Sequence, residues 1–154
     1  MRTRTFLACL AVFFAGISLA SAGDVQMGTW KLNEAKSTFS PGSTKNHTVV
    51  YAAVGDMVKV TVDGKDKDGK ATHNEWTGKF DGKDYAVTGD PTSDMRSYAK
   101  VDDHTLTLTS KMGGKVTGTG KIVVSADGKT RTVDVAGTDP SGKATKQTAV
   151  FDRQ

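Results

Sequence analysis

The sequence predicts an all-β fold: an antiparallel up-and-down meander closed into a single barrel of eight to ten strands, preceded by a signal peptide. The tripeptide Asp-Gly-Lys occurs four times, at residues 63–65, 68–70, 81–83 and 127–129. Asp-Gly tolerates the positive φ angles of primed hairpin turns, so each copy indicates a place where the chain reverses. Most segments between these turns are rich in Val and Thr and alternate polar with apolar residues, which is typical of half-buried strands.

Ten segments are predicted to be strands. The clearest covers residues 57–63, where Val58, Val60 and Val62 alternate with polar residues. Short strands separated by turn signals indicate a sandwich or a barrel, and a meander removes its exposed edges most simply by closing into a barrel. The ten segments are Thr29–Asn33, Thr48–Val54, Met57–Asp63, Thr72–Phe80, Tyr85–Gly89, Asp94–Val101, Thr105–Met112, Val116–Ser125, Thr130–Gly137 and Thr145–Asp152.

One connection is longer than a hairpin loop. Residues 34–45 carry Pro41-Gly42 in their middle and have room for one or two helical turns around Phe39 and no more. No composition shift divides the chain after the N-terminal segment, so a single domain over residues 23–154 is expected.

The N-terminal residues 1–22 have the pattern of a bacterial export signal. Arg2 and Arg4 are followed by an apolar run over residues 6–19 and by the small residues Ala20-Ser21-Ala22, which suit cleavage. The run is shorter than the ~20 residues that span a bilayer, although an uncleaved anchor is an alternative. We therefore expect a periplasmic or secreted protein without a membrane span after cleavage.

Cysteine content and charge narrow the possible chemistry. The only cysteine is Cys9, inside the predicted signal, so we expect neither disulfides nor thiolate chemistry in the mature chain. Lysines alternate with aspartates around the turns, which indicates a solvated surface of mixed sign and not a nucleic-acid interface. The expected oligomeric state is a monomer.

The start of the first strand reads Gly28-Thr29-Trp30-Lys31-Leu32. It resembles the Gly-x-Trp motif of the calycin superfamily, the lipocalin and fatty-acid-binding-like barrels. The resemblance implies that Trp30 plugs the closed end of the barrel, with its ring packed under an arginine. Two departures are clear: residues 34–45 are too short for the helix-turn-helix that covers a fatty-acid-binding barrel, and Ala149 and Phe151 stand where its carboxylate-binding Arg and Tyr would be.

Aromatic residues and the few arginines supply the candidate ligand site. A cavity lined by aromatic side chains, a Met and a few polar groups is the usual form of a small-molecule site. An inward arginine is able to pair with an anionic head group. The alternative is that the same side chains only fill the barrel. The candidate ligand-binding residues are Trp76, Phe80, Tyr85, Met95, Arg96, Tyr98 and Arg131.

Metal and catalytic motifs are weak. Residues 64–75 resemble a calcium loop, but Gly64 occupies the first position, where a carboxylate is needed. His73 and Glu75 lie two apart and are too few for a metal site. The sequence holds no nucleophile elbow, zincin motif or phosphate loop. We therefore expect no metal, no cofactor and no enzymatic activity.

These observations favour an exported protein that holds a small, mostly apolar ligand in a barrel lumen. The alternative is a solid-core barrel that acts as a structural or protein-interaction module of the envelope. Its function would then lie in loops such as residues 34–45 and 89–94.

Overall fold

The computed structural model describes residues 24–139 and 141–154, so the predicted signal at residues 1–22 lies outside the described part. The described residues form one antiparallel sheet. In chain order its elements are β1 (Gly28–Leu32), the 3₁₀ helix η1 (Glu34–Lys36), β2 (Thr38–Phe39), β3 (Lys45–Val54), β4 (Met57–Lys65), β5 (Ala71–Gly78), β6 (Tyr85–Thr88), β7 (Met95–Lys100), β8 (Thr105–Met112), β9 (Lys115–Val124), β10 (Thr130–Thr138) and β11 (Ala144–Arg153). No helix in this part of the chain is long and apolar enough to cross a bilayer.

The sheet closes on itself. From β3 to β11 each strand pairs with the next, and β1 joins β3 to β11. The closing ladder aligns Trp30 with Arg153 and Leu32 with Phe151. The predicted closed meander is therefore confirmed, with ten strands in the wall of the described chain and β2 as an addition along β11.

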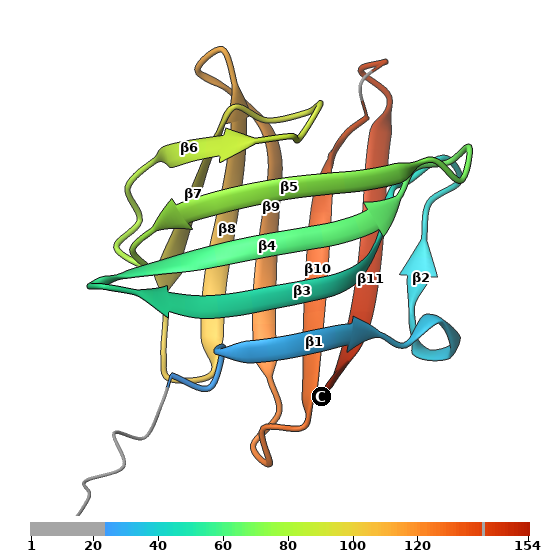
Figure 1. The fold of residues 1–154 in the computed structure, drawn as a ribbon. Helices are drawn as coiled ribbons and strands as arrows, with labels where there is room; N and C mark the ends of the chain where they lie inside the picture. Colours follow the sequence, from blue (N-terminus) through green and yellow to red (C-terminus); the bar gives the residue numbers. More distant parts are fainter. Residues whose placement is uncertain (1–23, 140) are drawn as a thin grey trace, which may run out of the picture.

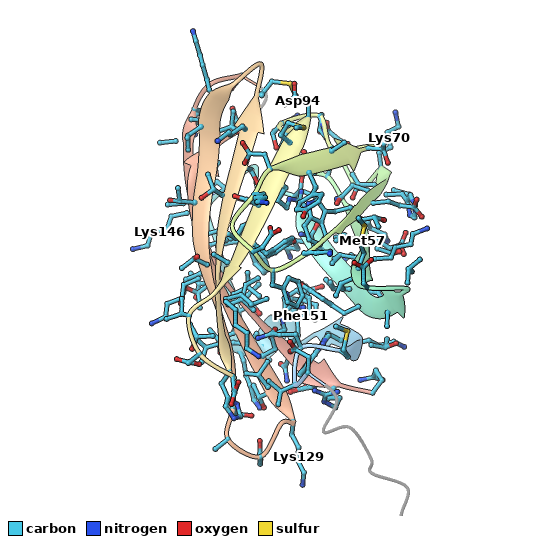
Figure 2. The ribbon with its side chains drawn as sticks, turned by 90° about the vertical axis from the view of Figure 1, so that its left-hand side faces the viewer. Met57, Lys70, Asp94, Lys129, Lys146 and Phe151 are labelled. Atoms are coloured by element: carbon cyan, nitrogen blue, oxygen red, sulfur yellow. The ribbon has the colours of Figure 1, made fainter. Side chains whose placement is uncertain are left out.

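The wall has two halves that run across each other. Figure 1 shows β1, β3, β4 and β5 lying crosswise in front of β8 to β11, with β6 and β7 joining the halves at one side. Figure 2 shows Phe151 between the halves, whereas Lys70, Lys129 and Lys146 point outward. The space between the halves is thus the interior of the barrel.

The turns follow the glycines, but only partly as predicted. Gly113-Gly114 is a primed turn, because both residues have positive φ angles. Gly69 and Gly128 have positive φ angles but end their turns, because their N–H groups donate to Asp66 O and Ser125 O three residues earlier, so these Asp-Gly-Lys copies do not form primed turns. Asp63-Gly64-Lys65 is not a turn at all but the end of β4, because the chain reverses a few residues later at Gly69.

The connection at residues 34–45 also differs from the expectation. Its helical part is the short η1, and Phe39 belongs to strand β2 instead of a helical turn. Thr38 and Phe39 pair with Thr148 and Gln147 of β11, so a tertiary strand partner decides their conformation.

Register around the wall stacks the interior side chains in layers. Along β10 and β11 the inward residues pair as Arg131 with Phe151, Val133 with Ala149, and Val135 with Gln147. Because successive inward positions are two residues apart, these three pairs mark levels from the floor of the barrel to its mouth. The lowest level is charged and aromatic, the middle is apolar, and the highest is mixed.

The floor is built on Trp30, which is fully buried. Its Nε1–H donates to Gln26 O at 2.9 Å, and the guanidinium of Arg153 lies 4.3 Å from the centre of its ring. Arg153 also donates to the carbonyl oxygens of Met27 and Gly128, each at 2.6 Å, and to Val25 O. Trp30 thus lies under an arginine, and Arg153 links residues 25–27 and the β9–β10 turn to the floor.

We expect Arg153→Met to lower the free energy of unfolding by about 2–4 kcal/mol, because it removes charge-assisted hydrogen bonds and a cation–π contact. Urea unfolding followed by tryptophan fluorescence measures this change. The exposed Lys129 at the same end is the control, and Lys129→Met should leave stability almost unchanged. Equal stability of the two variants would show that Arg153 does not hold the floor.

Candidate functional site

The barrel holds a cavity of about 160 Å³ that extends from its floor up to the level of Val135 and Gln147. Apolar side chains from both halves of the wall form most of its lining. Two arginines and two tyrosines converge on the same space. The apolar residues, arginines and tyrosines that line the cavity include Val49, Tyr51, Val62, Arg96, Tyr98, Leu108, Ile122, Arg131, Val133, Ala149 and Phe151.

A second space of about 180 Å³ forms the mouth above this cavity. Loops at residues 42–44 and 89–92 and the ends of β8 to β11 surround it. The two spaces share the lining residues Asn46, Asn74, Ser110, Val135 and Gln147, so the mouth is continuous with the lumen. Four of these five side chains are polar, which makes the entrance wettable above an apolar middle.

The predicted aromatic residues form one cluster on the wall. The Trp76 ring lies 4.7 Å from Tyr98 in an edge-on contact, 5.7 Å from Tyr85 and 6.3 Å from Phe80, measured between centroids. Gly78 makes room for this cluster, because a Cβ there would come within 2.6 Å of the Trp76 and Tyr85 rings. Trp76 lies on the same face of β5 as the cavity-lining Asn74 and is buried in the core, but of this aromatic cluster only Tyr98 lines the cavity.

Arg96 lies in the lumen and has an acidic partner, although its Nε has no hydrogen-bond partner among the described residues. Its Nη2 donates to Asp90 Oδ2 at 2.7 Å and its Nη1 to Asn74 Oδ1 at 3.3 Å. Both charged side chains are nearly buried, with exposed fractions of 10% and 15%. Burial alone raises the pKa of Asp90, but hydrogen bonds from Ser93 and Thr92 and the charge of Arg96 outweigh it, so the pKa lies below its ordinary value. This pair is electrically neutral.

Arg131 lies lower in the lumen and has no acidic partner among the described residues. Only 2% of it is exposed, and its Nη2 donates to the Tyr51 hydroxyl. Its guanidinium lies 4.4 Å from the Tyr51 ring centre and 5.9 Å from that of Phe151. Within residues 24–139 and 141–154, its Nε and Nη1 have no hydrogen-bond partner.

The phenol beside Arg131 does not supply the missing negative charge. Burial raises the pKa of Tyr51 far above its ordinary value, and the opposing effect of Arg131 is smaller. Tyr51 is therefore neutral at any physiological pH. An uncompensated buried cation costs several kcal/mol of stability. An anion bound at the floor of the lumen would reduce this cost.

Of the predicted ligand-binding residues, Arg96, Tyr98 and Arg131 come together around the cavity. Met95 is half-buried at the start of β7 and lines neither the cavity nor the mouth. Sequence reasoning missed Tyr51 and Asp90. Tyr51 follows Val49 on the inward face of β3, so strand alternation could have found it, whereas nothing local pairs Asp90 with Arg96.

Residues 64–75, which resemble a calcium loop in sequence, form strand ends and a hairpin turn. Asp66 Oδ1 accepts the N–H groups of Asp68 and Lys70, which organises a hairpin turn. His73 Nδ1 lies 2.7 Å from Asp63 Oδ1 on the outer surface. No group of three or more His, Cys, Asp or Glu side chains in the described residues is arranged to hold a metal ion.

Comparison with known proteins supports the fold alone. Neither a family model nor a curated protein matches the sequence. The solved structure of EF1p2_mFAP2b bound to DFHBI is 14% identical, with a TM-score of 0.51 over 84% of this chain and 94% of that chain. The redesigned β-barrel mFAP1 bound to DFHBI is 16% identical, with a TM-score of 0.47 over 84% and 95% of the two chains, a similarity too weak to carry an argument. The similarity to EF1p2_mFAP2b supports the closed-barrel fold of this chain.

We expect Asp90→Asn to lower the free energy of unfolding by about 3 kcal/mol at pH 7, because it leaves Arg96 buried without its carboxylate. The folded-state pKa of Asp90 is depressed, so the carboxylate stabilises the fold above about pH 4 and loses this effect as the pH falls through that pKa. The difference between wild type and variant should therefore shrink in urea unfolding at pH 3.

The control for this change is Asp103→Asn. The Asp103 side chain is 90% exposed, and its loss should have little effect at either pH. A stability difference for Asp90→Asn that stays the same from pH 7 to pH 3 would contradict the proposed ion pair.

Proposed function

We propose that this protein is an exported binding module that holds one small, mostly apolar molecule in its barrel lumen. The observation that carries the proposal is the lumen itself: a cavity with an apolar middle, closed by Trp30 below and continuous with a polar mouth above. Sites for small molecules have this composition, mainly apolar with a few convergent polar groups.

The volume of the cavity limits the size of the ligand. Its 160 Å³ is close to the ~150 Å³ of an engineered apolar cavity that accepts benzene. Lumen and mouth together fall at the lower end of the range of about 300–1,000 Å³ that is common for ligand pockets. The fitting ligand is thus one ring or a short chain whose far end reaches the mouth.

The interior is not filled by its own side chains, which disfavours the alternative of a solid core. A barrel of similar fold, EF1p2_mFAP2b, is bound to DFHBI, so the architecture is compatible with a small ligand, although fold alone does not specify function. Under the solid-core alternative, the loop at residues 89–94 would bind other proteins. In the structure, Asp90 of this loop accepts a hydrogen bond from Arg96 inside the barrel.

Export and kinship to the calycin superfamily belong to the same proposal. All strands of the closed wall lie between residues 28 and 153, so the barrel needs no part of the predicted signal. The arginine-covered Trp30 supports the calycin resemblance. Fractionation of the native bacterium, with the mass of the mature chain, tests export: a cytoplasmic protein that still carries residues 1–22 would refute it.

Lumen binding predicts that native mass spectrometry of the protein from its host detects a bound small molecule, which Ala149→Leu removes. Ala149 is buried and lines the cavity, and the larger side chain would fill it. We also expect the variant to be more stable by about 1 kcal/mol, as cavity filling commonly is.

The matched control is Ala136→Leu on the exposed face of β10. It introduces the same side chain outside the barrel and should leave the bound molecule in place. A wild-type protein without bound molecule, or one whose ligand survives Ala149→Leu, would contradict binding in the lumen.

A further inference from the structure

The floor of the lumen presents a buried cation to the cavity without an internal anion. We propose that this floor is a binding site for the carboxylate of a small organic monoanion, with Arg131 and the Tyr51 hydroxyl as its donors. The inference rests on the proposed lumen binding and adds the chemical class and the orientation of the ligand.

Charge balance in the lumen points to a single negative charge. The charged side chains that line the cavity or the mouth are Arg96, Arg131, Asp90 and Asp139. Asp90 neutralises Arg96. Asp139 belongs to the β10–β11 turn at the rim, where its Oδ1 accepts the N–H groups of Ser141 and Lys143. Arg131 is left as one uncompensated positive charge, which a monoanion neutralises and a dianion would exceed.

The available donors suit a carboxylate. Arg131 uses one N–H on Tyr51, and within the described residues its Nε and Nη1 have no acceptor. Nε and Nη1 are not the two prongs of one guanidinium fork, so one of them would donate a single charge-assisted hydrogen bond to one carboxylate oxygen. Tyr51 accepts a hydrogen bond from Arg131 through its oxygen and therefore keeps its own O–H to donate.

The layers of the barrel determine how such a ligand would lie. Arg131 and Phe151 form the lowest pair on β10 and β11, and Val133 with Ala149 follow above them. Val49 and Leu108 line the same cavity. The carboxylate would therefore enter first and reach the floor, its apolar part would lie in this middle level, and any polar end would face Asn46, Ser110 and Gln147 at the mouth.

This site differs from one that a last-strand Arg-x-Tyr pair would form. Ala149 and Phe151 occupy those positions on β11, and they line the cavity as apolar wall. The donors come instead from β10 and β3, 80 residues apart in sequence.

Isothermal titration of the whole barrel, freed of any co-purified molecule, with benzoate and with benzamide tests the proposal. The two probes share a shape that suits the cavity and differ in charge. We expect wild type to bind benzoate at least ten-fold more tightly than benzamide. Arg131→Met should remove this preference while benzamide binding changes less than three-fold, and Arg131→Lys should retain part of it.

The matched control is the double variant Arg96→Met with Asp90→Asn, which removes the other buried arginine together with its partner and leaves the lumen charge unchanged. It should keep the preference for benzoate. Thermal melts check folding, and Arg131→Met should melt no lower than wild type, because it removes an unpaired buried charge.

The remaining outcomes separate the two proposals. Equal binding of benzoate and benzamide by wild type would overturn the carboxylate site and leave lumen binding standing. Sulfate that competes with benzoate at equal or lower concentration would also overturn it, since a dianion would then suit the floor better. Loss of benzoate binding in the control but not in Arg131→Met would assign the anion to Arg96 instead. Binding of neither probe, together with a native protein that carries no ligand, would end both proposals.

Discussion

The pairing of β1 with β11 is the interaction on which the rest of the structure depends. Only three residue pairs make this ladder, yet they convert an open meander into a barrel with an inside. Trp30 stands in the ladder and pairs with Arg153, whose guanidinium covers the indole ring. Backbone closure and floor packing are therefore one unit: the strand that seals the wall also carries the side chain that seals its end.

Closure of the barrel places the two buried arginines in different environments. A charge inside a barrel has few ways to reach water, so it needs a partner within the protein or in the lumen. Arg96 lies next to a loop that can supply a carboxylate, and Asp90 does so at 2.7 Å. Arg131 lies among Trp30, Tyr51 and Phe151, which offer aromatic faces and one neutral hydroxyl. The same residue type thus forms a structural link at one level and an unsatisfied donor at another.

The lumen stays open at one end because nothing in the described chain covers it as Trp30 covers the floor. The connection that could have formed a lid is short: η1 has three residues, and β2 lies along β11 instead of across the mouth. Two residues without side chains, Gly118 and Gly137, also line the mouth. Access to the lumen therefore requires no large rearrangement of the wall.

Much of the fold could be read from the sequence, because strands and hairpins are specified locally. The alternation of Val58, Val60 and Val62 shows which face of β4 is inward whatever the strand pairs with. Thr105–Met112 was predicted with both boundaries correct, and Gly113-Gly114 reverses the chain with its own φ angles. Errors arose where a distant partner overrides local preference, as for Phe39 in β2 and Gly64 in β4.

The antiparallel meander and a set of aromatic and arginine side chains suited to an interior thus follow from the residues alone, whereas the closed end at Trp30 was implied by the calycin resemblance. The sequence could not tell which of those side chains meet. Alternation has a period of two residues, whereas the neighbours of an inward side chain depend on the stagger of strands around the closed wall. Only that stagger brings Tyr51 of β3 to Arg131 of β10 and sends Asp90 to Arg96, and so decides which arginine remains without an anion.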